Sequence, residues 1–215
     1  MALGYLLGKA SAKPLKLNPN VPVLMVLSIL PDIDIIFGLE GFHRGPTHSV
    51  VTAFLVFLPF FVFYRQKALP YFLAFVSHGL IGDLLVGGNL QLFWPIRDTL
   101  VFMPAPFPMI SITSRLNVAL ESALFLLALV VMVKSKDFLL FFRRRLSNLV
   151  LVIPIFTVLL PTVIGYPLDV PILLVPTHLF FLVLFTVSVL ILFFSALGLK
   201  GRHNMQYSSK VDSER

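Results

Sequence analysis

Six long apolar stretches, separated by short polar or basic segments, dominate the pattern of this sequence. They run over residues 21–37, 47–64, 69–86, 116–133, 149–164 and 172–197. A helix needs about 17–25 mostly apolar residues to cross the hydrocarbon core of a bilayer. The pattern therefore predicts an all-α integral membrane protein with about six transmembrane helices.

Two of these stretches contain residues that interrupt a regular helix. The first contains Asp32 and Asp34 next to Pro31, and the fifth contains Pro154 and Pro161. Proline removes a backbone hydrogen-bond donor and bends or breaks a helix. We therefore expect the first span to be short and the fifth to be kinked.

The composition supports a protein whose main partner is the lipid bilayer. Hydrophobic residues make up 58% of the chain and charged residues 13%, and the mean hydropathy is +0.94. Soluble domains usually carry about 25% charged residues. Cysteine is absent, so disulfides and thiolate metal ligands are excluded, and any metal must bind to imidazole or oxygen ligands.

The basic residues lie almost entirely on one side of the predicted bundle. The basic segments on that side are 9–16, 65–67, 134–145 and 200–210, and the opposite side has Arg44, Arg97 and Arg115. Cytoplasmic loops of membrane proteins are enriched in Lys and Arg. We therefore expect a multi-pass protein of the cell membrane with both termini in the cytoplasm, and no nucleic-acid partner despite the net charge of +7.

This pattern predicts one domain and a tail. Residues 1–200 are expected to form a single multi-pass membrane domain, with its motifs between residues 30 and 126. Residues 201–215 are mostly polar and are expected to be a disordered cytoplasmic tail.

Ionisable residues are concentrated in the first half of this apolar chain. They are Asp32, Asp34, His43, His48, His78 and Asp83. Burying such groups is costly unless they meet a partner, a water-filled cavity or a metal. In the predicted topology they lie near the outer ends of the helices, and Glu121 lies about a turn and a half into the fourth span. The sequence thus predicts a polar metal site near the outer interface.

Three motifs carry these residues. They are Leu30-Pro31-Asp32-Ile33-Asp34, then His43-Arg44-Gly45-Pro46-Thr47-His48-Ser49, then Ser77-His78 followed by Asp83 and Phe93-Trp94-Pro95. Together with Glu121 they resemble the membrane-bound metal-dependent hydrolases, the YdjM-like group, and in particular its archaeal members. The resemblance covers about residues 30–126. It implies a membrane-embedded relative of the zinc-dependent phospholipase C and P1-nuclease group that hydrolyses an ester or phosphoester.

The chain departs from the family pattern in two places. Many relatives have a histidine within the first few residues, where this chain has Tyr5. Relatives often place an acid four residues after the histidine, whereas Asp83 comes five after His78. On a regular helix, five positions turn two side chains about 140° apart. We therefore predict a π-bulge, or an early helix end, between His78 and Leu84.

The expected metal ligands are Asp32, Asp34, His48, His78 and Asp83. A mixed set of imidazoles and carboxylates favours zinc, with manganese and iron as alternatives. The simpler interpretation is that the first two aspartates and His48 only cap or begin helices. Thr47 and Ser49 are expected to orient His48 or cap a helix rather than act as nucleophiles.

Two further residues are candidates for catalysis. His43 is interpreted either as a ligand or as a proton shuttle. Glu121 is interpreted as a catalytic base, a ligand or a residue that orients the ligands, and the alternative is a structural ion pair with Arg115 or Arg97. The guanidinium groups of Arg44, Arg97 and Arg115 suit a substrate phosphate, and anchoring at the membrane interface would explain them equally well.

The predicted function is a hydrolase that uses metal-activated water, and a lipid-linked phosphoester is the substrate class that its location suggests. One alternative is a transporter or proton-coupled carrier that uses buried Asp and His. Such proteins often have repeated halves, and we find no repeat. The other alternative is a protein with a purely structural metal. His178, isolated in the sixth apolar stretch, is interpreted as a packed histidine outside the site.

Overall fold

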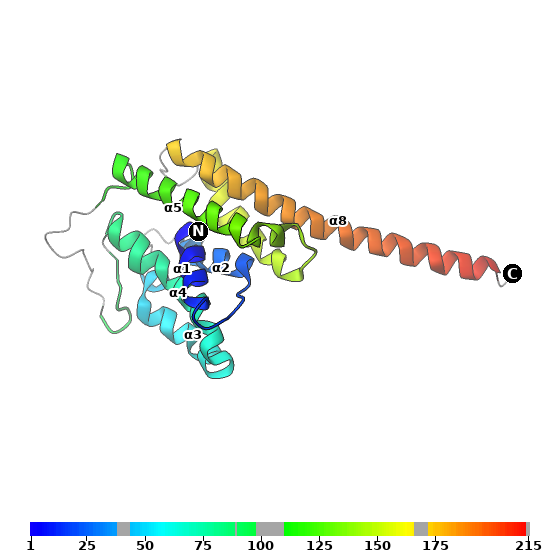
Figure 1. Ribbon diagram of the computed structural model, residues 1–215, viewed down its shortest axis with the longest axis horizontal. Coiled ribbons are helices and arrows are strands. Elements are labelled where there is room, and N and C mark those ends of the chain that lie inside the picture. The colour runs from blue at the N-terminus through cyan, green and yellow to red at the C-terminus, as the bar shows by residue number, and fades with distance from the viewer. Residues whose placement is uncertain (38–43, 89, 98–109, 166–171, 214–215) are drawn as a thin grey trace.

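The computed structural model describes residues 1–37, 44–88, 90–97, 110–165 and 172–213, which are almost entirely helical (Figure 1). The α-helices are α1 (Ala2–Ala12), α2 (Val21–Leu27), α3 (Val50–Tyr64), α4 (Leu69–Ser77), α5 (Arg115–Lys134), α6 (Val152–Pro154), α7 (Leu160–Ile164) and α8 (Val175–Ser213). The 3₁₀ segments are η1 (Leu30–Phe37), η2 (Pro46–His48), η3 (Arg65–Ala68), η5 (Asp137–Phe142), η6 (Leu146–Leu151) and η8 (Ile172–Leu174). The π-helical segments are η4 (His78–Asp83) and η7 (Ile155–Leu159).

Four helical segments in the described residues are long and apolar enough to cross a membrane. They are Val50–Asp83, Arg115–Lys134, Leu146–Ile164 and Ile172–Leu197. By this measure the all-helical membrane architecture is confirmed, and the predicted number of six spans is not.

The first of these segments folds back on itself. The ring of Phe57 in α3 lies 5.6 Å from that of Phe72 and 5.8 Å from that of Phe75, both in α4, measured between centroids. The two helices are therefore antiparallel. The chain reverses at η3, where Arg65 has a φ of 49°.

The outward faces of the long helices are apolar. Phe63 of α3 is 80% exposed, Leu126 of α5 is 59% exposed and Phe194 of α8 is 64% exposed. Soluble monomers rarely expose contiguous apolar surface on this scale. These faces are suited to contact with lipid chains.

The buried core joins elements from both ends of the sequence. Tyr5 of α1, Met25 of α2, Met132 of α5, Leu151 of η6 and Phe185 of α8 are all fully buried in one cluster. The last helix therefore shares one core with the first two, while its own direct neighbours include η5, η6 and η7, and the N-terminal elements lie inside the bundle.

The first apolar stretch is short and interrupted, as predicted. The α-helix α2 has seven residues and ends at Leu27, and the chain then continues as the 3₁₀ segment η1. Pro31 has no backbone N–H, so a regular helix cannot continue through it. Asp32 and Asp34 follow directly and are held on the tighter turn of η1.

The helix α1 lies against α2, α4 and α5 near the centre of the bundle (Figure 1). This approach requires a glycine at position 4. A Cβ atom there would lie 2.2 Å from Cβ of Ser28 and 3.1 Å from the carbonyl oxygen of Ala74. No larger residue fits at position 4 unless α1 moves away from its neighbours.

Tyr5 connects α1 to the end of α5 rather than to the cluster of acids and histidines. Its hydroxyl donates a 2.8 Å hydrogen bond to Oδ2 of Asp137, and Nζ of Lys9 lies 2.9 Å from the same oxygen. Burial raises the pKa of the Tyr5 phenol above its ordinary value, so the group stays protonated as the donor. In this chain Tyr5 has a structural role.

The segment Leu146–Ile164 has the irregularity that its prolines predict. It passes through η6, α6, the π-helical η7 and α7, with Pro154 and Pro161 next to the two ends of η7. Proline has no backbone N–H, so a carbonyl one turn earlier loses its hydrogen-bond donor. A local π-helical turn is one way in which the helix accommodates this loss.

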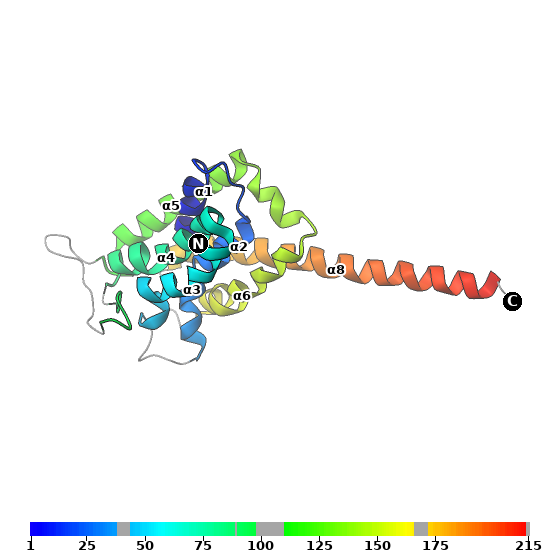
Figure 2. The same ribbon diagram turned by 90° about the horizontal axis from the view of Figure 1, so that it is seen from below.

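The structure differs from the predicted disordered tail, because α8 continues as a helix to Ser213. Both views show this part of α8 projecting beyond the other helices (Figures 1 and 2). Extending an existing helix adds one hydrogen bond per residue without a new nucleation cost. The long apolar part of α8 thus provides a start from which the polar residues continue the helix.

Gly4→Ala is expected to lower the free energy of unfolding by about 1–3 kcal/mol, the usual cost of overpacking. The thermal unfolding midpoint in detergent measures this loss. Adding Ser28→Gly removes the nearer of the two clashing atoms and should restore part of the stability. Equal stability of Gly4→Ala and wild type would contradict the close packing of α1 on α2.

Candidate metal site

Two aspartates and two histidines from three short segments converge on one point. Nε2 of His78 lies 2.9 Å from Oδ1 of Asp32 and 3.5 Å from Oδ2 of Asp83. Nε2 of His48 lies 3.4 Å from the same Asp32 oxygen and 3.3 Å from the same Asp83 oxygen. Two imidazole nitrogens and two carboxylate oxygens therefore form one compact group of donor atoms, which we call the Asp–His cluster.

Three of these residues have the spacing of metal ligands. Ligand atoms of Asp32, His48 and His78 all lie within 4.8 Å of one another, and ligands about 2.0–2.2 Å from a metal at the corners of a tetrahedron lie roughly 3.3–3.6 Å apart. Asp83 contacts both imidazoles, at 3.3 and 3.5 Å, but does not belong to this set of three. Asp32, His48 and His78 can therefore hold a divalent ion, and Asp83 lies beside them.

The π-helical turn η4 brings His78 and Asp83 to the same side of their helix. It runs from His78 to Asp83, the two residues that an α-helix would turn about 140° apart. The predicted π-bulge is confirmed. The extra residue in this turn explains how an acid five positions after the histidine still reaches the cluster.

The segment η2 packs directly on η4 at Gly79. A Cβ atom at this position would lie 2.6 Å from the backbone oxygen of His48. The absence of a side chain therefore lets the His48 ring approach His78, with 5.2 Å between the ring centroids.

Thr47 and Asp34 fix the orientation of the His48 ring. The hydroxyl of Thr47 donates a 2.7 Å hydrogen bond to Oδ2 of Asp34, so its oxygen can accept a hydrogen bond from Nδ1–H of His48, 3.0 Å away. With the proton on Nδ1, the lone pair of Nε2 points toward Asp32 and Asp83. Oδ2 of Asp34 also lies 3.6 Å from Nδ1, where it can orient the ring, and its role as a direct ligand stays a prediction.

Ser49 has the capping role predicted for it. Its hydroxyl oxygen accepts hydrogen bonds from the backbone N–H groups of Val51 and Thr52 at the start of α3. The hydroxyl also lies 2.6 Å from the carbonyl oxygen of Trp94. These contacts hold the entry of α3 in place next to His48.

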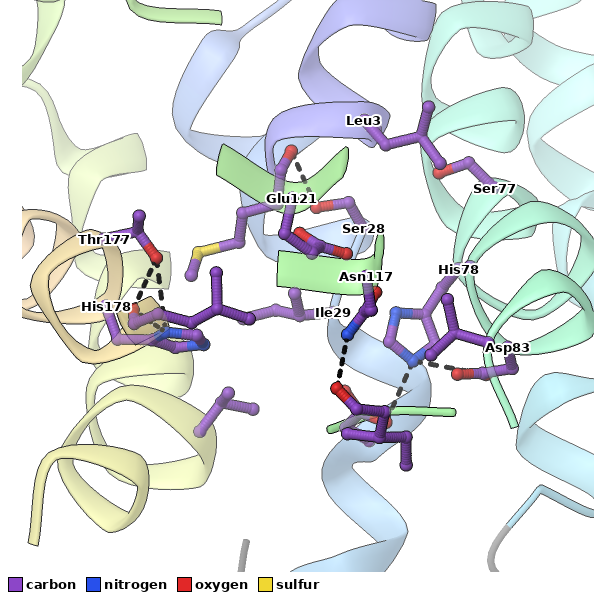
Figure 3. A pocket seen from close by; sticks show the side chains of 18 of the residues that line it. Leu3, Ser28, Ile29, Ser77, His78, Asp83, Asn117, Glu121, Thr177 and His178 are labelled. Carbon is purple, nitrogen blue, oxygen red and sulfur yellow. Dashed lines mark hydrogen bonds and ion pairs between the residues drawn. The ribbon is translucent and has the colours of Figure 1, made fainter. Parts of the chain in front are cut away.

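A cavity of about 270 Å³ lies beside the Asp–His cluster. Figure 3 shows His78 and Asp83 on one side of it and His178 and Thr177 on the other, with Glu121 and Asn117 between them. Asp32 also lines the cavity, whereas the His48 side chain is fully buried. One side of the cluster is therefore accessible from the cavity.

His178 lines this cavity, although we expected from the sequence that it lies outside the site. Its Nδ1 lies 2.9 Å from the carbonyl oxygen of Leu174. Because a carbonyl only accepts hydrogen bonds, the proton is on Nδ1, and Nε2 is available for other contacts. The imidazole is thus fixed at the start of α8, on the wall of the cavity.

A sequence signal for His178 exists. Pro176-Thr177-His178 repeats the tripeptide Pro46-Thr47-His48. In both copies the threonine oxygen lies close to Nδ1 of the following histidine, at 3.4 Å and 3.0 Å respectively. A search for this tripeptide would have paired the two histidines.

Of the other predicted residues, Glu121 and Arg44 line the cavity. In the described residues Glu121 forms no ion pair with Arg97 or Arg115, so the structural alternative for it is not found. Nη1 of Arg44 donates a 2.7 Å hydrogen bond to the carbonyl oxygen of Gly88. Arg97 and Arg115 are exposed and are not among the described residues that line the cavity. His43 lies outside the described residues.

Comparison with known proteins gives one match. The model of the family described as YdjM inner membrane protein matches residues 1–166, a range that contains the whole Asp–His cluster and Glu121. No curated protein and no solved structure matches the chain. His178 lies beyond the matched range.

Gly79→Ala is expected to force η2 away from η4 and to lower the free energy of unfolding by about 1–3 kcal/mol. Gly82→Ala is the matched control, because its new Cβ atom would meet its nearest neighbour, the Ser77 oxygen, at 3.8 Å. Thermal unfolding of both variants in detergent measures the difference. Equal effects of the two substitutions would argue against the contact between His48 and Gly79.

Proposed function

The chain belongs to the YdjM inner membrane protein family, and we propose that it is a membrane-embedded, metal-dependent hydrolase that cleaves an ester or phosphoester. The observation that carries the proposal is the convergence of four donor atoms, within 2.9 to 3.5 Å of their neighbours, beside a cavity large enough for a small substrate group. The family match supports the membrane location alone.

The residues that would hold the ion are Asp32, His48, His78 and Asp83. Two imidazoles and two carboxylates favour zinc, with manganese and iron as alternatives. A divalent ion in such a site lowers the pKa of water to near neutrality and stabilises negative charge on the attacked oxygen. Asp34 and Thr47 keep His48 in the tautomer that this role requires.

Residues on the cavity walls supply the remaining chemistry in this proposal. Nε2 of His178, which is unprotonated while Nδ1 donates to Leu174, accepts a proton from the attacking water and returns it to the leaving group, and Glu121 accepts a hydrogen bond from the same water and orients it. Arg44, held by Gly88, contributes a positive charge for a substrate phosphate. These groups lie on α5, α8 and the segment before η2, so the substrate would bind between elements rather than on one of them.

The accessible side of the Asp–His cluster argues against a purely structural metal. Structural zinc sites have all four positions closed by protein ligands and no route for water. Here Asp32, His78 and Asp83 line the cavity. Water or a substrate in the cavity could therefore reach an ion held by these residues.

A proton-coupled carrier is the other candidate. Buried Asp and His residues serve proton relays in such proteins, and the cavity extends from the Asp–His cluster to His178. The close spacing of imidazole and carboxylate donor atoms supports metal binding instead, because a proton relay does not need several of them around one point. Metal content therefore discriminates between the two functions.

We also propose six crossings, with both termini in the cytoplasm and the site open to the outer side. Residues 21–37 form the first crossing, α3 and α4 count separately because they are antiparallel, and the other three candidate spans follow. The basic segments then lie at the ends of the helices away from the Asp–His cluster.

Metal content, measured by mass spectrometry on detergent-purified protein, tests the proposal. Wild type is expected to hold near-stoichiometric zinc, manganese or iron, and Asp32→Ala and His78→Ala are expected to lose it. Asp34→Asn should weaken metal affinity by about 10–100-fold, the usual effect of removing an orienting partner. His178→Gln is the matched control, since it removes a cavity histidine outside the ligand set and should keep the metal.

The result that would overturn the hydrolase is wild type without metal even after reconstitution. That outcome would favour the proton-coupled carrier, whose buried acids and histidines need no ion. Loss of metal from His178→Gln as well would place this residue in the ligand set instead of on the opposite wall.

His178→Gln is expected to lower hydrolysis of a generic phosphodiester, bis-p-nitrophenyl phosphate, by about 10²–10⁴-fold while the metal stays bound. The loss should affect kcat more than KM, because proton transfer acts in the transition state. Substitution of His203, farther along the same helix, is the control and should leave the rate unchanged. An unchanged rate in His178→Gln would remove this residue from the proposed mechanism.

A further inference from the structure

A second and larger cavity, of about 820 Å³, lies between α1 and the C-terminal end of α5. Of the residues that line it, it shares only Leu3 with the cavity beside the Asp–His cluster. Its described lining is apolar at one end and basic at the other. The apolar end has Leu3, Leu6, Leu7, Ala10 and Val131, and the basic end has Lys9, Lys13, Lys16 and Lys134. We call it the α1–α5 groove.

The apolar part of the groove follows one face of α1. Leu3, Leu6, Leu7 and Ala10 recur at intervals of three and four, which places them on the same side of the helix, and Lys13 continues the row. The ten steps of helix from Leu3 to Lys13 span about 15 Å. This length equals one leaflet of a hydrocarbon core that is about 30 Å thick.

Three of the four lysines are available for a ligand. Lys9 is ion-paired with Asp137 at 2.9 Å, so its charge is compensated. In the part of the chain that the structure describes, no acidic side chain pairs with Lys13, Lys16 or Lys134. Their three positive charges therefore lie together at the mouth of an apolar groove.

From this arrangement we infer that the α1–α5 groove is a binding site for an anionic phospholipid from the leaflet on the basic side of the protein. The phosphate and its anionic headgroup lie among Lys13, Lys16 and Lys134, and an acyl chain lies along Leu3, Leu6, Leu7 and Ala10. A zwitterionic lipid brings its own cation to the lysines, so the charge pattern selects against it. The inference does not depend on the proposed hydrolysis.

The test uses the full chain in nanodiscs that contain phosphatidylcholine with a minor fraction of phosphatidylglycerol. Native mass spectrometry then identifies the lipids that remain bound to the released protein. We expect wild type to retain phosphatidylglycerol at least about tenfold above its share in the disc, since each lysine near anionic lipid contributes roughly fivefold. The variant Lys13→Gln/Lys16→Gln/Lys134→Gln should retain the two lipids in proportion to their amounts.

Two further variants separate the groove from general surface charge. Arg143→Gln/Arg144→Gln/Arg145→Gln removes three exposed charges from the same side of the protein and should keep the enrichment. Ala10→Trp fills the exposed apolar end of the groove without changing any charge and should lose it. All variants are compared after size-exclusion chromatography, so that misfolded protein is removed before the measurement.

Two results would overturn the inference. Equal loss of enrichment in the arginine variant would mean that the whole basic side attracts anionic lipid. Full enrichment in Ala10→Trp would mean that no acyl chain occupies the groove.

Discussion

The architecture around the Asp–His cluster depends on one constraint, the cost of holding carboxylates and imidazoles inside an apolar bundle. An unpaired buried charge is strongly unfavourable, and the group becomes tolerable when an opposite charge or a metal lies within contact distance. Each of the four donor atoms here has two such neighbours within 3.5 Å. The segments that carry these four residues depart from the regular α-helix, and this departure brings their donor atoms together.

Three backbone irregularities meet that constraint. Pro31 prevents a regular helix, so that Asp32 lies on a 3₁₀ turn. The π-helical turn η4 brings Asp83 to the same side as His78. Gly79, which has no side chain, lets the backbone of His48 approach η4. An ideal α-helix at any of these positions would direct at least one donor atom elsewhere. Irregular backbone at membrane depth is tolerated when protein or a water-filled cavity surrounds it, and both surround it here.

Much of this could be predicted from the sequence, because the signals are local. Hydrophobic runs of span length predicted the helices, Pro154 and Pro161 predicted an irregular fifth segment, and the five-residue spacing from His78 to Asp83 predicted the π-helical turn. Other features depend on contacts between distant segments. The burial of α1 has no local pattern, and the Pro-Thr-His repeat marks His178 without placing it beside the cavity, because both positions result from how distant helices pack together.

The role of Asp34 shows the same limit at the level of one side chain. Its spacing from Asp32 is compatible with two ligands of one metal, and the choice between ligand and orienting residue depends on Thr47. Because the Thr47 hydroxyl donates to Asp34 and lies next to Nδ1 of His48, the carboxylate acts on the edge of the ring away from Nε2. A hydrogen bond between residues 13 positions apart thus favours the orienting role that we propose for Asp34, whereas its spacing from Asp32 in the sequence favours a ligand. The helix α1 likewise acts through contacts with distant segments. It lines both cavities, so its packing affects the shape of each.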